Sequence, residues 1–202
     1  MTRRIKDLNE EISRWAFEIL FKDNQHWKIA FTNPTAGPWK TIKATNSYGK
    51  EGEVYRFPLE ETRPDIILYN DELEAILIVE AKDSLTKLVS GDQAEKSVAV
   101  VERLADILSR LDNNPYWNKR AHYPVYIGIL WGSTNVLSNN TDISSVFDIY
   151  YACAQAKQSI NKDFIFGIES LYTNGQIECH FHYKVYTPGQ EIRCTAIGLS
   201  LK

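Results

Sequence analysis

The stretch from Arg63 to Lys82 reads RPDIILYNDELEAILIVEAK and decides the fold. Two apolar runs, Ile66–Tyr69 and Ala75–Val79, are joined by a link that begins with the acidic, turn-forming residues Asn70–Glu72. Apolar runs of this length around a turn signal predict a strand, a turn and a second strand. The stretch therefore predicts an antiparallel pair of buried strands.

Three charged side chains lie at the ends of these two predicted strands. Asp65 begins the first strand, and Glu80 and Lys82 end the second. In an antiparallel pair, the start of one strand lies beside the end of the next. Because side chains alternate with a period of two, Glu80 and Lys82 share a face. We therefore expect the three charged groups to converge at one end of an otherwise apolar sheet.

This set of residues suits metal-assisted hydrolysis of a phosphodiester bond. Asp65, Glu80 and the backbone carbonyl of Ala81 would supply the oxygen ligands that Mg²⁺ takes, and Mn²⁺ is expected to substitute. The ion would polarise the phosphate and lower the pKa of an attacking water. Lys82 would orient or deprotonate that water and offset charge on the phosphate. The alternative is a metal-free globular protein in which the three charges only pair with one another.

The combination of Pro64-Asp65, a strand-turn-strand spacer and Glu80-Ala81-Lys82 resembles the motif of the PD-(D/E)xK nuclease superfamily. This superfamily includes most type II restriction endonucleases, several DNA-repair nucleases and junction resolvases. The resemblance implies that Asp65 and Glu80 bind the metal and that Lys82 is the catalytic lysine. It also implies cleavage that leaves a 5′-phosphate.

A second stretch resembles the EcoRI-like branch of restriction endonucleases. It contains Gly91–Gln93, a helix carrying Glu102–Arg103, and Tyr123–Val125 leading into a strand that ends at Trp131–Ser133. In that branch, the helix takes part in DNA recognition. The chain departs from the branch pattern at Ala99–Val100, where an asparagine is expected.

Further candidate residues lie outside the motif. The superfamily often carries a glutamate on its first helix that reaches the metal. Here the spacing of apolar residues predicts a first helix over Leu8–Lys22, and we expect Glu11, or alternatively Glu18, to take that part. A solvated acidic helix face explains both residues as well.

Five residues are candidates for contact with DNA. Gln93, Lys96 and Arg103 are expected on the helix after the motif, with a satisfied helix cap and surface ion pairs as the alternative. Gln93 and Lys96 also resemble the helix residues that assist the metal site in some members of the superfamily. Lys40 and Lys43 lie in a stretch that mixes basic, amide and aromatic residues, a mixture that suits phosphate contacts. The same mixture suits any exposed loop.

The order of predicted elements fits an α/β/α sandwich around a central mixed β-sheet, in a single domain covering residues 1–202. The expected order is a helix over 8–22, a three-stranded meander formed by 53–59, 66–69 and 75–79, a helix over 92–111, a buried strand over 124–131 parallel to the Glu80 strand, a helix over 142–160, a hairpin of 164–171 and 177–186, and a last strand within 191–201.

Several local expectations remain open between alternatives. Asp142 or Ser144 is expected to cap the third helix. Its Tyr150-Tyr151 pair is expected in the core, with a dimer interface as the alternative. His180 and His182 share one face of a predicted strand, where an exposed strand face is expected rather than a zinc site.

Composition sets broad limits on function. A net charge of −3 argues against a general nucleic-acid coat but allows a nuclease with a local basic surface. No apolar run approaches the roughly 20 residues that span a bilayer, and no apolar h-region follows the basic N-terminus. The three cysteines are scattered, so we expect a reduced, cytoplasmic protein.

These observations together predict a Mg²⁺-dependent type II restriction endonuclease that cuts double-stranded DNA at a specific sequence. Cutting both strands with one site per chain implies a homodimer. Two other classes remain open: a repair nuclease or junction resolvase of the same superfamily, and a non-catalytic DNA-binding protein on the same scaffold.

Overall fold

The computed structural model describes residues 27–33, 40–58, 61–134, 136–173, 176–187, 190–191 and 197–201. Its elements, in chain order, are β1 (Trp27–Thr32), β2 (Thr41–Thr45), β3 (Glu51–Arg56), β4 (Ile66–Asn70), β5 (Ala75–Lys82), the 3₁₀ helix η1 (Leu85–Leu88), α2 (Gln93–Ser109), the 3₁₀ helix η2 (Asn118–Arg120), β6 (Val125–Thr134), α3 (Asn140–Ala154), β7 (Asn161–Thr173), β8 (Gln176–Thr187), β9 (Gln190–Glu191) and β10 (Ile197–Leu201).

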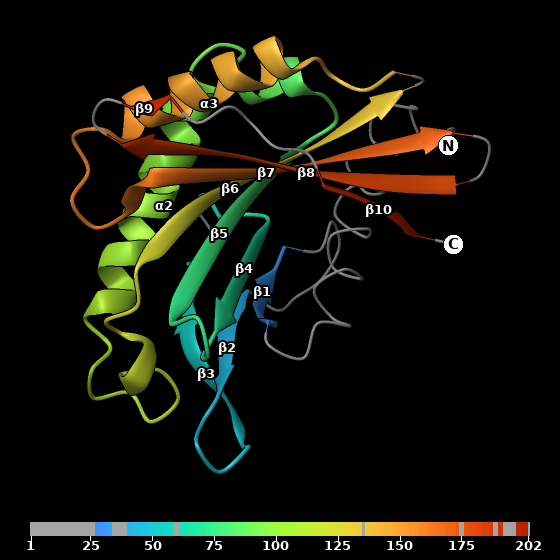
Figure 1. Ribbon diagram of the computed structural model, residues 1–202. Helices are drawn as coiled ribbons and strands as arrows, with labels where there is room; N and C mark the ends of the chain where they lie inside the picture. Colours follow the sequence, from blue (N-terminus) through green and yellow to red (C-terminus); the bar gives the residue numbers. More distant parts are fainter. Residues whose placement is uncertain are drawn as a thin grey trace.

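A mixed β-sheet forms the centre of the molecule, in the order β1-β4-β5-β6-β7-β8-β10 with β9 paired to β8 (Figure 1). Strands β4 and β5 are antiparallel, β5, β6 and β7 are parallel, and β7 and β8 are antiparallel. The predicted α/β class with a mixed sheet is confirmed, as are the Arg63–Lys82 strand pair and the parallel strand after the helix. The carboxyl ends of three parallel strands therefore meet at one edge.

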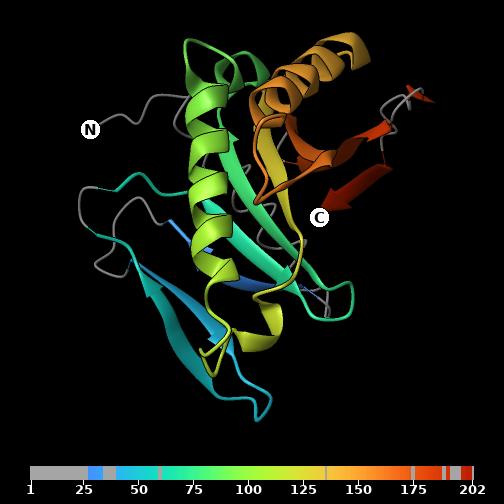
Figure 2. The same cartoon turned by 90° about the vertical axis from the view of Figure 1, so that its left-hand side faces the viewer.

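Helices α2 and α3 cover one face of this sheet (Figure 2). Helix α2 turns an apolar stripe toward the sheet, and all of its members are buried: Ala94, Val98, Val101, Leu104, Ala105 and Leu108. The stripe packs in one cluster with Ile67, Ile78 and Ile129 of the sheet and Phe147 of α3. Since side chains alternate along a strand, Glu80 and Lys82 extend toward the same face as Ile78.

The opposite face of the sheet is apolar and buried as well. Ile66, Leu68, Val79 and Leu130 pack there and are at most 1% exposed. Both faces of β4 and β5 are thus withdrawn from water, as in the middle layer of a layered α/β protein. The helix predicted over 8–22, with Glu11 and Glu18, lies outside the described residues.

The predicted three-stranded meander is wrong. Strand β3 pairs with β2 in a separate two-stranded sheet, and the neighbour of β4 is β1, which the sequence analysis did not predict. Two prolines, Pro58 and Pro64, stand between β3 and β4 and remove backbone donors that a tight hairpin would use. Phe57 instead packs on Phe31 of β1, with ring centroids 4.8 Å apart.

The helix predicted over 142–160 is shorter and begins earlier. Asn139 caps it, accepting a hydrogen bond of 2.8 Å from the backbone N–H of Asp142, so the predicted caps Asp142 and Ser144 are wrong. An asparagine with an extended backbone is among the best N-caps. Tyr150 is fully buried, as the core interpretation predicted, and Tyr151 is partly buried against the same core cluster.

The predicted β-hairpin near the end of the chain is confirmed as β7 and β8, which pair from Phe164↔Val185 to Thr173↔Gln176. The predicted last strand corresponds to β10. In the described part of the chain, no helix is long and apolar enough to cross a membrane.

Candidate active site

Asp65 lies where the sequence predicts, beside the carboxyl end of β5. Ile66 pairs with Val79, and the backbone N–H of Asp65 donates to the carbonyl of Val79 at 3.1 Å. The Asp65 carboxylate accepts a hydrogen bond of 2.7 Å from the N–H of Ala81 through Oδ2. The residue is only 8% exposed. The carboxylate is therefore held directly against the backbone between Glu80 and Lys82.

Glu80 and Lys82 share a face at the end of β5 and contact each other. Nζ of Lys82 forms an ion pair with Oε1 of Glu80 and donates a hydrogen bond of 3.2 Å to the Ala81 carbonyl. The side chains of Lys82 and Glu80 are 21% and 16% exposed. The lysine thus stands beside two of the oxygen atoms predicted as metal ligands.

The first turn of α2 adds a fourth side chain to this group. Nε2 of Gln93 donates to Oε1 of Glu80 at 3.1 Å and to Oγ of Ser97 at 3.0 Å. Oγ of Ser97 donates back to the Gln93 carbonyl at 2.8 Å. These bonds fix the amide in one orientation and connect the sheet to the beginning of α2.

Helix α3 reaches the same network from the other side. The Tyr150 hydroxyl donates to the Leu88 carbonyl at 3.1 Å and lies 3.5 Å from Oγ of Ser97. Burial raises the pKa of Tyr150 well above its ordinary value, so the hydroxyl remains protonated and acts as a donor. The candidate site is therefore braced by the sheet, η1, α2 and α3.

The donor set fits a hard divalent cation. Asp65, Glu80 and the Ala81 carbonyl offer oxygen ligands only, which suit Mg²⁺ rather than a thiolate- or imidazole-bound metal. Among the described residues, no group of three or more His, Cys, Asp and Glu side chains could hold a metal ion. Mg²⁺ commonly uses one or two carboxylates and completes its shell with water and substrate oxygens.

The other candidates on α2 lie outside this group. Nζ of Lys96 pairs with Asp92 at 2.8 Å, and both side chains are well exposed. Asp92 occupies the N-cap position, but its side chain makes no capping hydrogen bond. Arg103 lies farther along the helix, where it donates to the Thr62 carbonyl and pairs with Glu61 at 3.7 Å. Arg103 thus fastens the loop that leads to Asp65.

Lys40 and Lys43 belong to the segment that forms the β2–β3 hairpin. The Lys40 carbonyl accepts a hydrogen bond of 2.8 Å from the Phe57 N–H. Nζ of Lys43 pairs with Glu51 at 3.5 Å on the exposed side of the hairpin. The hairpin runs away from the candidate site: Thr45 donates to the hydroxyl of Tyr69, which is four residues, or about 13 Å, along β4 from Asp65.

A second polar cluster, which the sequence did not predict, lies on β7 and β8. Glu169 of β7 is fully buried, and its Oε2 lies 3.3 Å from Nε2 of His182 on β8. The expectation that His182 lies on an exposed strand face is wrong, since the residue is 4% exposed and stacks on Trp131. The sequence could have indicated this cluster through the predicted hairpin. A two-residue connection fixes the register of the two strands, which places Glu169 opposite His180 and therefore on the same face as His182.

Comparisons with known proteins give no assignment. No protein-family model matches the chain, and no curated protein matches it. The geometry of the residues at the end of β5 is therefore the basis for a functional interpretation.

Proposed function

We propose that the chain is a Mg²⁺-dependent endonuclease that cuts double-stranded DNA at a specific sequence, on a restriction endonuclease-like scaffold. One observation carries the proposal: Asp65, Glu80 and Lys82 meet at the carboxyl end of β5, with Nζ of Lys82 on both Glu80 and the Ala81 carbonyl. The mixed sheet, with the motif on an antiparallel strand pair and a helical crossover to a parallel strand, supports it.

The cost of this arrangement favours a functional role over a structural one. Removing carboxylates and an ammonium from water is expensive, and replacing a buried ion pair by apolar residues is often neutral or stabilising. Asp65, Glu80 and Lys82 are all largely withdrawn from solvent. Ionisable groups gathered in this way at a sheet end are typical of active sites.

Each residue has a defined part in the proposed hydrolysis. Asp65, Glu80 and the Ala81 carbonyl hold Mg²⁺, which when bound polarises the scissile phosphate and lowers the pKa of a water. Lys82 orients the attacking water and offsets the charge that develops on the phosphate. Gln93 holds Glu80 in position through its 3.1 Å hydrogen bond. Cleavage of both strands with one site per chain requires two copies, so the active form is a homodimer.

The second candidate is a repair nuclease or junction resolvase with the same residues. The same site chemistry favours it, because Asp65, Glu80 and Lys82 act on the phosphate and not on the bases. The two functions differ in substrate: one requires a sequence in intact duplex, the other a damaged or branched structure.

Incubation of the purified protein with unmethylated phage DNA in Mg²⁺ tests the proposal, with Asp65→Asn and Lys82→Met alongside. Both variants should abolish cleavage, and loss of Lys82 should cost on the order of 10²–10⁴-fold in rate. Two matched controls should cut normally: Asp106→Asn, a carboxylate paired with Arg110 at the far end of α2, and Lys157→Met, a lysine paired with Glu102.

The products separate the possible outcomes. Discrete fragments that both site variants abolish support a sequence-specific nuclease. A smear, or cleavage confined to branched DNA, moves the assignment to the repair or resolvase class. Absence of cleavage by folded wild-type protein in either Mg²⁺ or Mn²⁺ overturns the enzymatic proposal and leaves a non-catalytic DNA-binding protein.

A further inference from the structure

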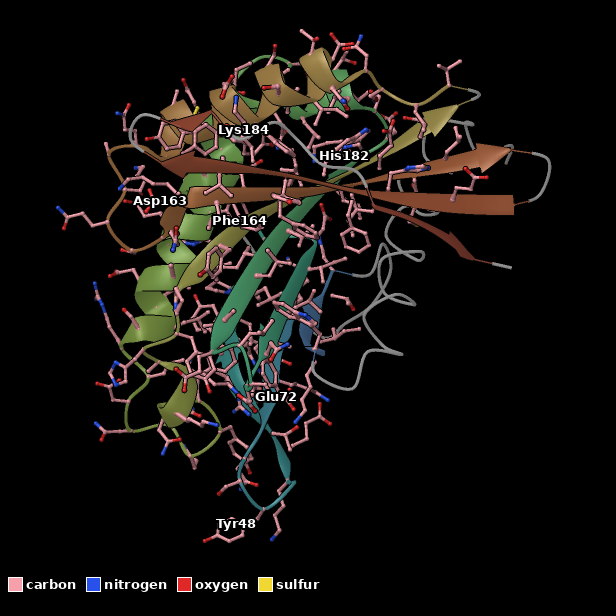
Figure 3. All side chains as sticks on the ribbon, in the orientation of Figure 1. Tyr48, Glu72, Asp163, Phe164, His182 and Lys184 are labelled. Carbon is pink, nitrogen blue, oxygen red and sulfur yellow. The ribbon has the colours of Figure 1, made fainter. Side chains whose placement is uncertain are left out.

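The Glu169–His182 cluster lies on the same sheet edge as the candidate site. Lys82 pairs with Trp131 across β5 and β6, and Trp131 pairs with Glu169 across β6 and β7. Glu169 is therefore level with Lys82 and two strands away, at about 10 Å. Figure 3 shows His182 on β8 beneath α3.

Glu169 binds the loop between β6 and α3. Its Oε1 accepts hydrogen bonds from Oγ of Ser133, from the N–H of Ser138 at 2.8 Å, and from Oγ of Ser138 at 2.8 Å. Trp131 Nε1 also donates to Oγ of Ser138 at 3.3 Å. One carboxylate oxygen thus joins the end of β6 to the last turn of the loop before Asn139 caps α3.

Burial of the second oxygen of this carboxylate, Oε2, destabilises the folded state. Oε2 of Glu169 and both ring nitrogens of His182 are buried without a hydrogen-bond partner among the described residues, although the two side chains lie at ion-pair distance. A buried charged group costs several kcal/mol unless its partners repay it. The hydrogen bonds that Oε1 accepts from Ser133 and Ser138 are therefore the described interactions that offset the burial of this carboxylate.

The anchored loop presents apolar side chains to solvent beside the site. Val136 is 75% exposed and Leu137 is 38% exposed. Thr134, the last residue of β6, lies three residues beyond Trp131, so the loop begins about 10 Å farther out than Lys82. The distance of about 10 Å across the strands from Lys82 to Glu169, and that of about 10 Å along β6, are comparable to the roughly 12 Å width of the DNA major groove.

We propose that Val136 and Leu137 contact the major groove of the substrate duplex beside the cleaved phosphate, and that Glu169 is the positioning residue that holds their loop. This inference rests on the proposed function. Apolar side chains in the major groove recognise the methyl group of thymine. The loop therefore adds an A·T preference to a site whose other residues act on the phosphate.

Steady-state cleavage by four variants tests this role. Glu169→Ala and Val136→Ser should raise KM about tenfold while kcat changes little, because the lost contact is made equally in bound substrate and transition state. Glu169→Gln should restore most of the affinity, because its amide oxygen can still accept from Ser138. Leu73→Ser is the matched control, since Leu73 is 67% exposed but lies in the turn at the other end of β5.

Amide hydrogen exchange of residues 136–139 supplies a readout that does not depend on cleavage. Glu169→Ala should accelerate exchange there and leave α2 unchanged. Unchanged exchange, an unchanged KM for Val136→Ser, or an equal effect of Leu73→Ser overturns the inference.

The two proposals fail in different ways. If the wild-type protein does not cut, the proposed function fails, and DNA binding in Ca²⁺ decides the role of the loop. Weaker binding by Val136→Ser than by Leu73→Ser then supports the groove contact, and equal binding overturns it.

Discussion

Nε2 of Gln93 lies 3.1 Å from Oε1 of Glu80, the same oxygen that pairs with Nζ of Lys82. One carboxylate oxygen thus receives a donor from α2 and a donor from its own strand. The orientation of the Glu80 carboxylate therefore depends on Gln93, an uncharged residue outside the motif of Pro64 to Lys82.

Loss of this amide should impair activity without unfolding the protein. Gln93→Leu removes the hydrogen bonds to Glu80 and Ser97 while keeping a side chain of similar size. Partners that orient a metal ligand are typically worth about 10–100-fold in metal affinity or activity. Cleavage rates as a function of Mg²⁺ concentration measure the effect. Glu95→Gln, an exposed change in the same helical turn, should match the wild type.

A buried ion pair at the opposite end of the sheet should be important for stability. Arg120 is 6% exposed, donates to both Asp71 carboxylate oxygens at 2.8 and 2.6 Å, and lies 4.3 Å from the Tyr69 ring centroid. Asp71→Asn leaves the guanidinium without its charged partner, which should cost about 3–5 kcal/mol in the free energy of unfolding.

Urea unfolding measures this loss. The comparison is Asp106→Asn, which breaks the exposed pair with Arg110 and should change stability by less than about 1 kcal/mol. A similar small effect for Asp71→Asn would show that the Arg120 pair contributes no more than a surface contact.

Gly167 should not tolerate a methyl group. A Cβ at this position would lie 2.6 Å from the Trp131 ring and 3.1 Å from the Phe147 ring, and both rings are fully buried. Overpacking of this kind costs about 1–3 kcal/mol. Thermal unfolding of Gly167→Ala checks the expectation, and Gly49→Asn is the control. Gly49 has a positive φ that asparagine tolerates, and a Cβ there meets no atom within 4 Å.

Stability should fall in acid partly through Glu169. Burial by itself would raise the pKa of this carboxyl, but the close contact with the His182 ring and the hydrogen bonds from Ser133 and Ser138 lower the pKa below its ordinary 4.5. A lowered folded-state pKa contributes stability that is present above about pH 4.5 and is lost as the pH falls through the folded value. His180 also faces this carboxylate across the β7–β8 pair, at register position Glu169↔His180.

The measurement is urea unfolding of the wild type and Glu169→Gln between pH 7 and pH 3. The wild type should lose more stability than Glu169→Gln over this range, because the amide does not titrate. Parallel curves for the two proteins would contradict the prediction.

The sequence predicted the parts of the fold and site that depend on local pattern. Alternation and turn signals place Asp65, Glu80 and Lys82 at one end of a strand pair, because the period of two and the antiparallel register follow from backbone geometry. The neighbours of that pair were predicted wrongly, because strand order depends on tertiary packing, such as Phe57 on Phe31, which no local pattern encodes.

The buried polar side chains of Glu169 and His182 show a second reason why the sequence-based prediction failed. Polarity alone placed His182 on an exposed face, since histidine is only sometimes buried. Its burial follows from the position of α3 and the stack on Trp131, which are contacts between segments far apart in the chain. The register of the β7–β8 pair was the only local signal for this cluster.

The separate β2–β3 sheet has a consequence for how such a protein can diversify. The hairpin forms its own ladder, and its tip, with Tyr48 87% exposed, projects past the Glu72 turn (Figure 3). Residues can therefore be inserted or exchanged at the tip without shifting the β4–β5 register that holds Asp65 against Ala81. Natural variants could carry a longer β2–β3 hairpin, or one with different charges, and keep the residues at the end of β5 unchanged.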